Sequence, residues 1–428
     1  MQIGNGRRAR TFLRGTPEFA ANGLLILASS VVANAGSFAL YFVGSRHLDQ
    51  RAYGDFYALV TATALAGALT TSASLVISKT TAELRSQALA ASLGGFTMWC
   101  RRAALAVAAA VFAIGCAAIV PISNYLHLVS PAEALPWALA TSITMAVPAY
   151  RGILQGCEDF VPLSISFALE GVGRGVLGSV AILCGYGVVG ALVAQGVAAL
   201  LTWSYVAAVV RKRFAGAPPA TFAPDARFFH TLLATGAALV ATASLASLDV
   251  LFAKHYLGAR DAAVYGVVAF CGRVVILLGT FVPLLTIPKV AAALGPGRSP
   301  LPVLAQALAA TGAVGLVALV PFVAFPHLVV RFFAGSGYSD AAQYVLLYGG
   351  IGVLLSLTNA VTAYQLATHR FRFIVPLAAA ACIEAGAIAA WHDSIATILA
   401  VALACNALAL IASAFGIATS GRTAPATP

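Results

Sequence analysis

The chain has 428 residues, 61% of them hydrophobic, and its mean hydropathy is +0.92. Lys and Arg together number 25, Asp and Glu only 14, and the formal net charge is +11. So apolar a composition excludes an ordinary soluble domain and predicts an all-α integral membrane protein.

A membrane-spanning helix needs about 20 mostly apolar residues. By this criterion the sequence predicts twelve spanning helices, near residues 19–45, 56–78, 103–121, 134–150, 161–182, 188–210, 229–253, 262–287, 301–325, 341–366, 373–391 and 395–418. The polar connections between them are short and leave no room for a soluble catalytic or ligand-binding domain. We therefore expect a protein that acts within the membrane and is not an enzyme.

The basic residues divide unevenly between the two sides that twelve helices create. One side holds Arg46, Arg51, Lys254, Arg260 and Arg331. Most of the others fall on the opposite side, among them Arg151 and the run 211–213. Because cytoplasmic connections carry the excess of Lys and Arg, the sequence predicts both termini in the cytoplasm. A nucleic-acid surface is not expected, since it needs one continuous basic face.

Two observations indicate that the chain consists of two similar halves. The interval 214–226 is rich in Pro, lies at the middle of the chain and is typical of a cytoplasmic linker. A Tyr-Gly pair recurs after 212 residues, at positions 53 and 265. The sequence therefore predicts an N-terminal six-helix lobe over residues 1–213 and a C-terminal six-helix lobe over residues 227–428.

Charged residues inside the apolar segments are the first candidates for function. They are Glu170, Arg174, Asp249, Arg273 and Glu384. An ionised side chain at the centre of a membrane helix costs about 2.5–3.5 kcal/mol on insertion scales, and it usually faces a protein interior or a water-filled cavity. Two helical lobes with such residues between them are typical of a transporter whose cargo passes near the midplane.

Three runs of residues follow one another in the order seen in a known family. They are Gly44-Ser45-Arg46-His47-Leu48 with Tyr53-Gly54-Asp55-Phe56, then Arg151-Gly152-Ile153-Leu154-Gln155-Gly156 with Phe160, then Asp249-Val250-Leu251-Phe252-Ala253-Lys254 with Leu257-Gly258 and Tyr265-Gly266. With these runs the chain resembles the polysaccharide flippases, the Wzx-like oligosaccharide exporters of the multidrug/oligosaccharidyl-lipid/polysaccharide superfamily.

The resemblance implies a MATE-like fold of two six-helix bundles around a V-shaped cavity. It implies a function in moving a polyprenyl-diphosphate-linked oligosaccharide, a polysaccharide precursor, across the cytoplasmic membrane by alternating access. Membrane lipids, a polysaccharide polymerase and its assembly proteins are the partners it implies.

The head group of such a cargo is anionic, and Arg suits bidentate contact with phosphate. We expect Arg273 to contact the diphosphate, with Arg174 as the second candidate and Lys254 as a third. Asp249 is the expected partner of Arg273 from a neighbouring helix. Glu170 and Arg174 stand four residues apart on one helix face, which suits a structural ion pair equally well.

The sequence contains no motif for ATP, zinc or a serine nucleophile, since it lacks G-x-x-x-x-G-K-[ST], H-E-x-x-H and G-x-S-x-G. The G-x-G-x-x-G pattern at 185–190 lies between two apolar segments and does not follow a strand. We therefore expect no cofactor and no metal centre. An ion gradient is the expected drive, with Asp249, Glu170 or Glu384 as the proton or sodium site.

Two other functions fit the same number of helices. One is a multidrug or metabolite cation antiporter of the same superfamily, and the other is a membrane-embedded glycan polymerase or ligase. A cationic cavity favours a diphosphate cargo and an acidic cavity favours organic cations, and three embedded acids beside two arginines do not decide between them. A polymerase or ligase generally needs a larger outer loop than the predicted helices leave.

Overall fold

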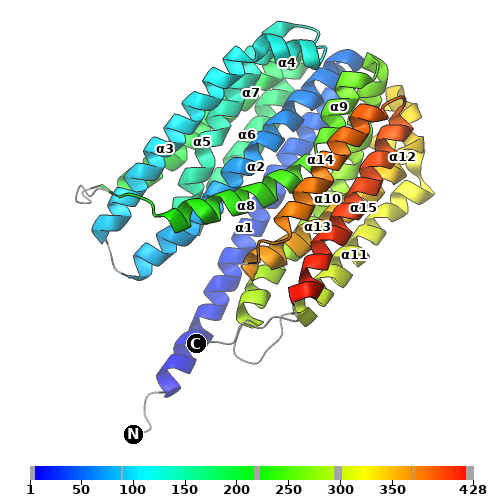
Figure 1. Cartoon of the computed structure of the whole chain (residues 1–428). Coiled ribbons are helices and arrows are strands. Elements are labelled where there is room, and N and C mark those ends of the chain that lie inside the picture. Colours follow the sequence, from blue (N-terminus) through cyan, green and yellow to red (C-terminus); the bar gives the residue numbers. More distant parts are fainter. Residues whose placement is uncertain (1–4, 88–89, 216–221, 294–300, 369, 421–428) are drawn as a thin grey trace. The chain divides into compact units, whose positions relative to one another are not determined.

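The computed structural model describes residues 5–87, 90–215, 222–293, 301–368 and 370–420. Over these residues every regular element is a helix (Figure 1). In chain order they are α1 (Asn5–His47), α2 (Gln50–Ser86), α3 (Ala90–Ala117), α4 (Ile119–Tyr125), η1 (Pro131–Glu133), α5 (Ala134–Gly156), α6 (Phe160–Leu183), α7 (Gly187–Arg213), α8 (Ala226–Leu245), α9 (Leu248–Tyr256), α10 (Ala259–Ala293), α11 (Leu301–Ala324), α12 (Pro326–Ala334), η2 (Ser336–Gln343), α13 (Val345–Ala367), α14 (Ile374–Ala390) and α15 (Ile395–Ser420). The prediction of an all-α protein is confirmed.

Ten of the described helices are long and apolar enough to span a membrane. Two more complete the set expected from the sequence. The helix α14 is apolar but shorter, and α5 covers the predicted segment 134–150 and continues past its end through Arg151. Each of the twelve predicted segments therefore contains a helix, and the chain is a multi-pass membrane protein.

The seventh predicted segment, 229–253, is two helices and not one. Ala246 and Ser247 separate α8 from α9, and Ser247 has a non-helical φ of −142°. The amides of both residues bond to carbonyls three residues back, at 3.2 and 3.1 Å, so the end of α8 is tightened as in a 3₁₀ turn. The break places Asp249 in the first turn of α9, where the helix dipole favours an acidic residue.

The chain divides into two compact units, and the first comprises Met1–Leu40, Ala73–Ala117 and Leu135–Asp225. Within this unit α6 packs along α7, and it approaches α1 closely. A Cβ atom added to Gly36, Gly171 or Gly175 would overlap the backbone of the opposite helix. Gly171 and Gly175 have the GxxxG spacing that lets membrane helices come into backbone contact.

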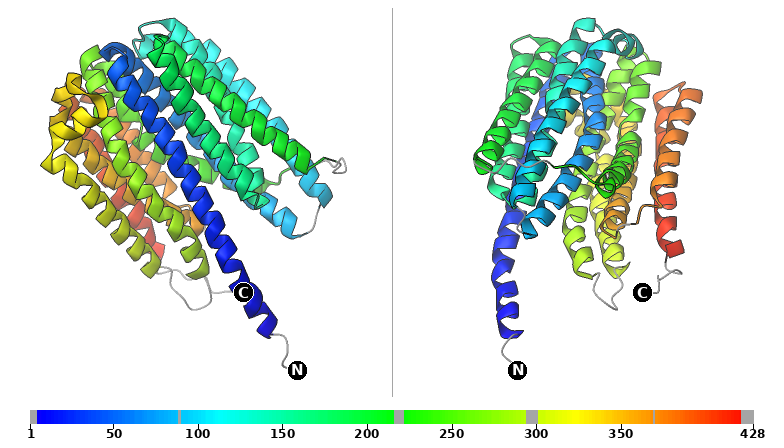
Figure 2. Two further views of the ribbon diagram at one scale, coloured as in Figure 1. Left: turned by 180° about the vertical axis from the view of Figure 1, so that it is seen from behind. Right: turned by 60° about the vertical axis from the view of Figure 1, so that its left-hand side comes forward.

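The second unit comprises Tyr41–Ser72, Ala118–Ala134 and Ala226–Pro428. In it α10 packs on α13, α11 and α15 pack on α13, and α14 packs on α8 and α15. The helices α14 and α15, coloured orange to red, lie side by side in Figures 1 and 2. Tyr265 and Tyr348 are fully buried in its interior.

Two parts of the second unit, Tyr41–Ser72 and Ala118–Ala134, precede the expected linker in sequence. The interior of that unit therefore draws on both predicted halves of the chain. The division into lobes over residues 1–213 and 227–428 stays a prediction, and residues 216–221 of the expected linker lie outside the described residues.

The connections predicted to be short outer loops contain helices of their own. The elements α4 and η1 follow α3, and α12 and η2 follow α11. The helix α12 buries Val329 and Val330, whereas its polar residues His327 and Arg331 are exposed. Hydrophobic periodicity over whole membrane spans gives no indication of such short helices.

Candidate functional site

The embedded charges predicted from the sequence lie in three groups of polar side chains on the described helices. We call them the Arg151 cluster (Ser37, Arg151, Ser166, Glu170 and Arg174), the Arg273 cluster (Tyr41, Tyr57, Thr61 and Arg273) and the buried acids (Asp249 and Glu384). The Arg151 cluster belongs to the first unit, and the Arg273 cluster and the buried acids belong to the second.

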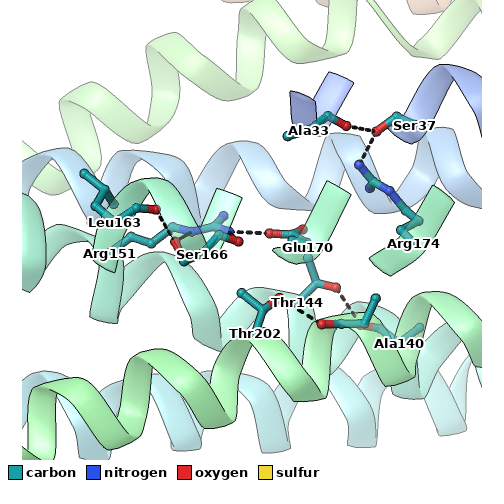
Figure 3. A network of polar contacts seen from close by, with 11 residues as sticks. Ala33, Ser37, Ala140, Thr144, Arg151, Leu163, Ser166, Glu170, Arg174 and Thr202 are labelled. Carbon is teal, nitrogen blue, oxygen red and sulfur yellow. Dashed lines mark hydrogen bonds and ion pairs between the residues drawn. The ribbon is translucent and has the colours of Figure 1, made fainter. Parts of the chain in front are cut away.

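In the Arg151 cluster, Glu170 of α6 forms an ion pair of 2.7 Å with Arg151 of α5 (Figure 3). Arg151 also donates to the hydroxyl of Ser166 at 2.9 Å and to its carbonyl at 2.8 Å. The side chains of the pair are only 11% and 18% exposed. Arg151, expected on the cytoplasmic side, is thus a buried partner that joins α5 to α6.

The ion pair expected between Glu170 and Arg174 is not among those formed by the described residues, because Arg174 turns toward α1 (Figure 3). One guanidinium nitrogen of Arg174 donates to the hydroxyl of Ser37, and Nε is buried with no acceptor in the described part of the chain. The close approach of α1 and α6 at Gly36 and Gly171 brings Ser37 within reach. Arg174 therefore has a neutral partner and an unused donor.

In the Arg273 cluster, the guanidinium of Arg273 from α10 lies among neutral groups of α1 and α2. It donates to Thr61 Oγ1 at 3.0 Å and to the hydroxyl of Tyr41 at 3.4 Å. It also lies 5.0 Å from the ring centroid of Tyr57, within the range of a cation–π contact. The side chain is partly exposed. A guanidinium has five N–H donors, so this group has donors left for an anion.

Within the described residues, no carboxylate forms an ion pair with Arg273. The expected pair with Asp249 is therefore replaced by another arrangement. Asp249 is 1% exposed and accepts a hydrogen bond of 2.7 Å from the hydroxyl of Tyr265. Because α9 begins anew after the break that separates it from α8, Asp249 faces this tyrosine of α10.

Glu384 of α14 is completely buried, and neither of its carboxyl oxygens has a hydrogen-bond partner among the described residues. Asp249 is near enough to interact with it electrostatically. An ionised carboxylate without a partner is very costly in such an interior. Such a carboxyl group is stable in the interior only when it is protonated or binds a cation.

Lys254, expected as a third contact for the diphosphate, is paired with Asp55 of α2. The two side chains are 5% and 0% exposed. Its ammonium charge is therefore neutralised inside the fold.

Sequence reasoning missed Arg151 and the hydroxyl groups that surround the two arginines. Tyr41, Tyr57 and Thr61 stand in apolar segments, where a single tyrosine or threonine gives no functional signal. Arg151 stands 19 residues before Glu170, so only the packing of α5 on α6 connects them. Asp55 does lie in one of the runs that carry the family resemblance.

The sequence matches the family described as "Polysaccharide biosynthesis protein" over residues 19–291, which is more than half of the chain. No curated protein matches the chain. Solved structures with a similar fold include an inward-facing multidrug resistance MATE family transporter of the MOP superfamily. That structure has a TM-score of 0.73 and 15% identity over 93% of this chain and 97% of its own.

Two further structures have the same fold. A MOP superfamily transporter from Pyrococcus furiosus has a TM-score of 0.65 and 14% identity, with 94% of this chain and 95% of that chain covered. The lipid II flippase MurJ, in an inward closed conformation, has a TM-score of 0.63 and 12% identity, with 95% of this chain and 88% of that chain covered. At these identities the likeness shows the fold alone.

Proposed function

Because the chain belongs to the polysaccharide biosynthesis protein family, we propose that it is a transporter that flips a polyprenyl-diphosphate-linked oligosaccharide across the cytoplasmic membrane. The proposal is supported by a fold that the chain shares with transporters of the MOP superfamily, a lipid II flippase among them. The distribution of Lys and Arg supports cytoplasmic termini. The cargo would then move from the inner to the outer leaflet by alternating access, and the protein would catalyse no reaction.

The guanidinium of Arg273, which forms no ion pair among the described residues although Asp249 interacts with it electrostatically, is the observation that carries this proposal. A guanidinium inside a membrane protein normally pairs with an acid. Arg273 instead has hydroxyl and aromatic neighbours, and no carboxylate of the described residues pairs with it. A diphosphate would supply the missing negative charge and accept the remaining donors in bidentate fashion.

Arg174 is the second candidate for contact with the diphosphate. Its guanidinium donates to the neutral hydroxyl of Ser37, and its Nε is buried without an acceptor among the described residues. Lys254 has less weight as a contact, since Asp55 already neutralises it.

The buried acids are proposed to couple transport to a proton or sodium gradient. Asp249 and Glu384 lie near each other in an interior that has no cation paired with either of them among the described residues. Uptake and release of one ion there would change the charge of a buried site by one unit, which is costly enough to drive a change of conformation. Glu170 has less weight as an ion site, because Arg151 already pairs with it.

The same buried acids favour a second candidate function, the export of organic cations in exchange for ions. In that case Asp249 or Glu384 would bind the cargo and Arg273 would be structural. The two candidates therefore assign opposite charges to the cargo.

A binding measurement on the purified full-length chain separates them. The anionic probe is a short-chain polyprenyl-diphosphate-linked oligosaccharide, and the cationic probe is tetraphenylphosphonium. We expect calorimetry to detect the anionic probe only, with inorganic pyrophosphate as a competitor. Saturable binding of tetraphenylphosphonium that Asp249→Asn abolishes, with no binding of the diphosphate, would favour the antiporter.

A further inference from the structure

Three charged residues that are distant in sequence meet in the second unit. Asp55 of α2 pairs with Lys254 of α9, and both are almost completely buried. Glu133, the last residue of η1, is 5% exposed and lies near enough to interact with both of them. We call Asp55, Glu133 and Lys254 the charged latch.

Asp55 also fastens the connection that carries Glu133. The amide of Val129 donates to Asp55 Oδ2 at 2.7 Å, and η1 begins two residues later with Ser130 as its cap. Oε2 of Glu133 has no hydrogen-bond partner among the described residues. The site thus holds one cation and two carboxyl groups, which are contributed by three separate segments.

The two sides of the latch come from the two predicted halves of the chain. Asp55 and Glu133 precede the expected linker at 214–226, and Lys254 follows it. Alternating access requires helices of the two halves to separate at one side of the membrane and then to rejoin. A buried ion pair is weak evidence for stability, but charged groups are readily hydrated when such a joint opens.

We propose that Asp55, Glu133 and Lys254 hold the outer ends of α2 and α9 together, and that acid strengthens this closure because a neutral Glu133 is buried there at a lower cost than an ionised one. The inference rests on the proposed function only in that the chain is taken to alternate between two states. It does not depend on which cargo is carried. The side is the one that the distribution of basic residues predicts to be outside.

The direction of the pH effect follows from the surroundings of Glu133. The pKa of Glu133 is raised from its ordinary value of 4.5 to about 7, mainly by burial of the side chain and further by the nearby carboxylate of Asp55. Asp49 adds a smaller increase in this pKa, whereas the ammonium of Lys254 lowers it. When the latch opens to water, the pKa returns toward 4.5. The closed state therefore binds the proton more tightly, and closure is favoured fully below pH 4.5 and lost as the pH rises through 7.

Two histidines near the charged latch, His127 and His255, would oppose closure when they carry charge. The rings of His127 and His255 stack at 5.4 Å, and His255 Nδ1 lies 2.6 Å from the carbonyl of Tyr125. Positive charges on both rings would repel each other and weaken the closed arrangement. Closure that strengthens in acid therefore distinguishes Glu133 from these histidines.

The test is a distance measurement by pulsed electron paramagnetic resonance on the full-length protein in lipid nanodiscs. Spin labels are placed on Arg51→Cys and Ala259→Cys, two exposed positions at the ends of α2 and α10. The exposed native Cys184 and Cys382 are changed to serine. Wild type should show mainly the short distance at pH 5, and the ratio of short to long distances should fall by about tenfold or more at pH 8.

Glu133→Gln mimics the protonated side chain and should keep the short distance at both pH values. Asp55→Asn/Lys254→Met removes the ion pair without leaving a buried charge, and it should lower the closed fraction at pH 5. Gel filtration verifies that each variant is folded and monodisperse. A wild-type ratio that does not change with pH, or a Glu133→Gln ratio that changes as much as wild type, overturns the inference. A pH-responsive latch in a protein that binds no diphosphate would refute the proposed cargo alone.

Discussion

The carboxylate of Glu170 lies 2.7 Å from the guanidinium of Arg151 on α5, and it does not pair with Arg174 four residues along its own helix. This cross-helix pair is held further by Ser166, which accepts from Arg151 through its hydroxyl and its carbonyl. Glu170 and Arg174, which stand on one helix face, therefore have different partners. Arg151 and Glu170 join α5 to α6, and Arg174 turns to Ser37 while it still interacts with Glu170 electrostatically.

Removal of one charge from this pair should destabilise the protein. Glu170→Gln leaves the buried guanidinium of Arg151 without a counterion, which costs about 3 kcal/mol or more. A melting curve in detergent should show a clear fall in Tm. The matched control is Glu158→Gln, which removes an exposed partner of Arg85 in a pair of 3.0 Å and should cost about 0–1 kcal/mol.

The double variant Arg151→Met/Glu170→Met should be more stable than either single variant, because it leaves no unpaired charge. If Glu170→Gln costs no more than Glu158→Gln, the pair does not stabilise the contact between α5 and α6.

A methyl group between α1 and α6 should disrupt the packing in the first unit. A Cβ on Gly175 would overlap the backbone of Gly36, so Gly175→Ala should lower the free energy of unfolding by about 1–3 kcal/mol. Gly312 in α11 has no atom within 4 Å of an added Cβ. Gly312→Ala should therefore be neutral or stabilising by up to about 1 kcal/mol. Equal thermal shifts for the two variants would contradict the backbone contact.

The buried acids should be needed for coupling and not for folding. Glu384→Gln and Asp249→Asn keep the shape of each side chain but abolish ion binding by the carboxylate. In vesicles with an imposed proton or sodium gradient, each variant should transport at the rate that wild type shows after the gradient is collapsed. Glu158→Gln serves as the exposed control. Gradient-stimulated transport by Glu384→Gln at the wild-type rate would exclude Glu384 from coupling.

The long helices could be predicted from the sequence because apolar composition over about 20 residues is a local property. The break at Ala246 and Ser247 could not, since two small residues do not interrupt an apolar run. The partner of Glu170 was predicted wrongly because the spacing rule considers one helix only, and Arg151 reaches Glu170 through the packing of α5 on α6. The complete burial of Glu384 could not be predicted either, because it depends on α8, α14 and α15 packing together.

Binding of the anionic probe should depend both on the charge of Arg273 and on the planar fork of its guanidinium. Arg273→Ala removes the charge-assisted hydrogen bonds that Arg273 donates to the diphosphate, each of which contributes about 1.5–3 kcal/mol, so affinity for the anionic probe should fall by tenfold or more. Arg273→Lys keeps the charge and should lose less. Arg260→Ala, which removes an exposed partner of Asp340, is the control and should bind as wild type does.

The most direct measurement is the movement of a fluorescent polyprenyl-diphosphate-linked oligosaccharide across the bilayer of vesicles that contain the full-length protein. A lectin added outside reports the cargo that reaches the outer leaflet. We expect wild type and Arg260→Ala to move it at equal rates, with Arg273→Ala reduced at least tenfold. Movement by Arg273→Ala at the wild-type rate would contradict the assignment of Arg273 to the diphosphate. No movement by wild type beyond that of protein-free vesicles would contradict the proposed function itself.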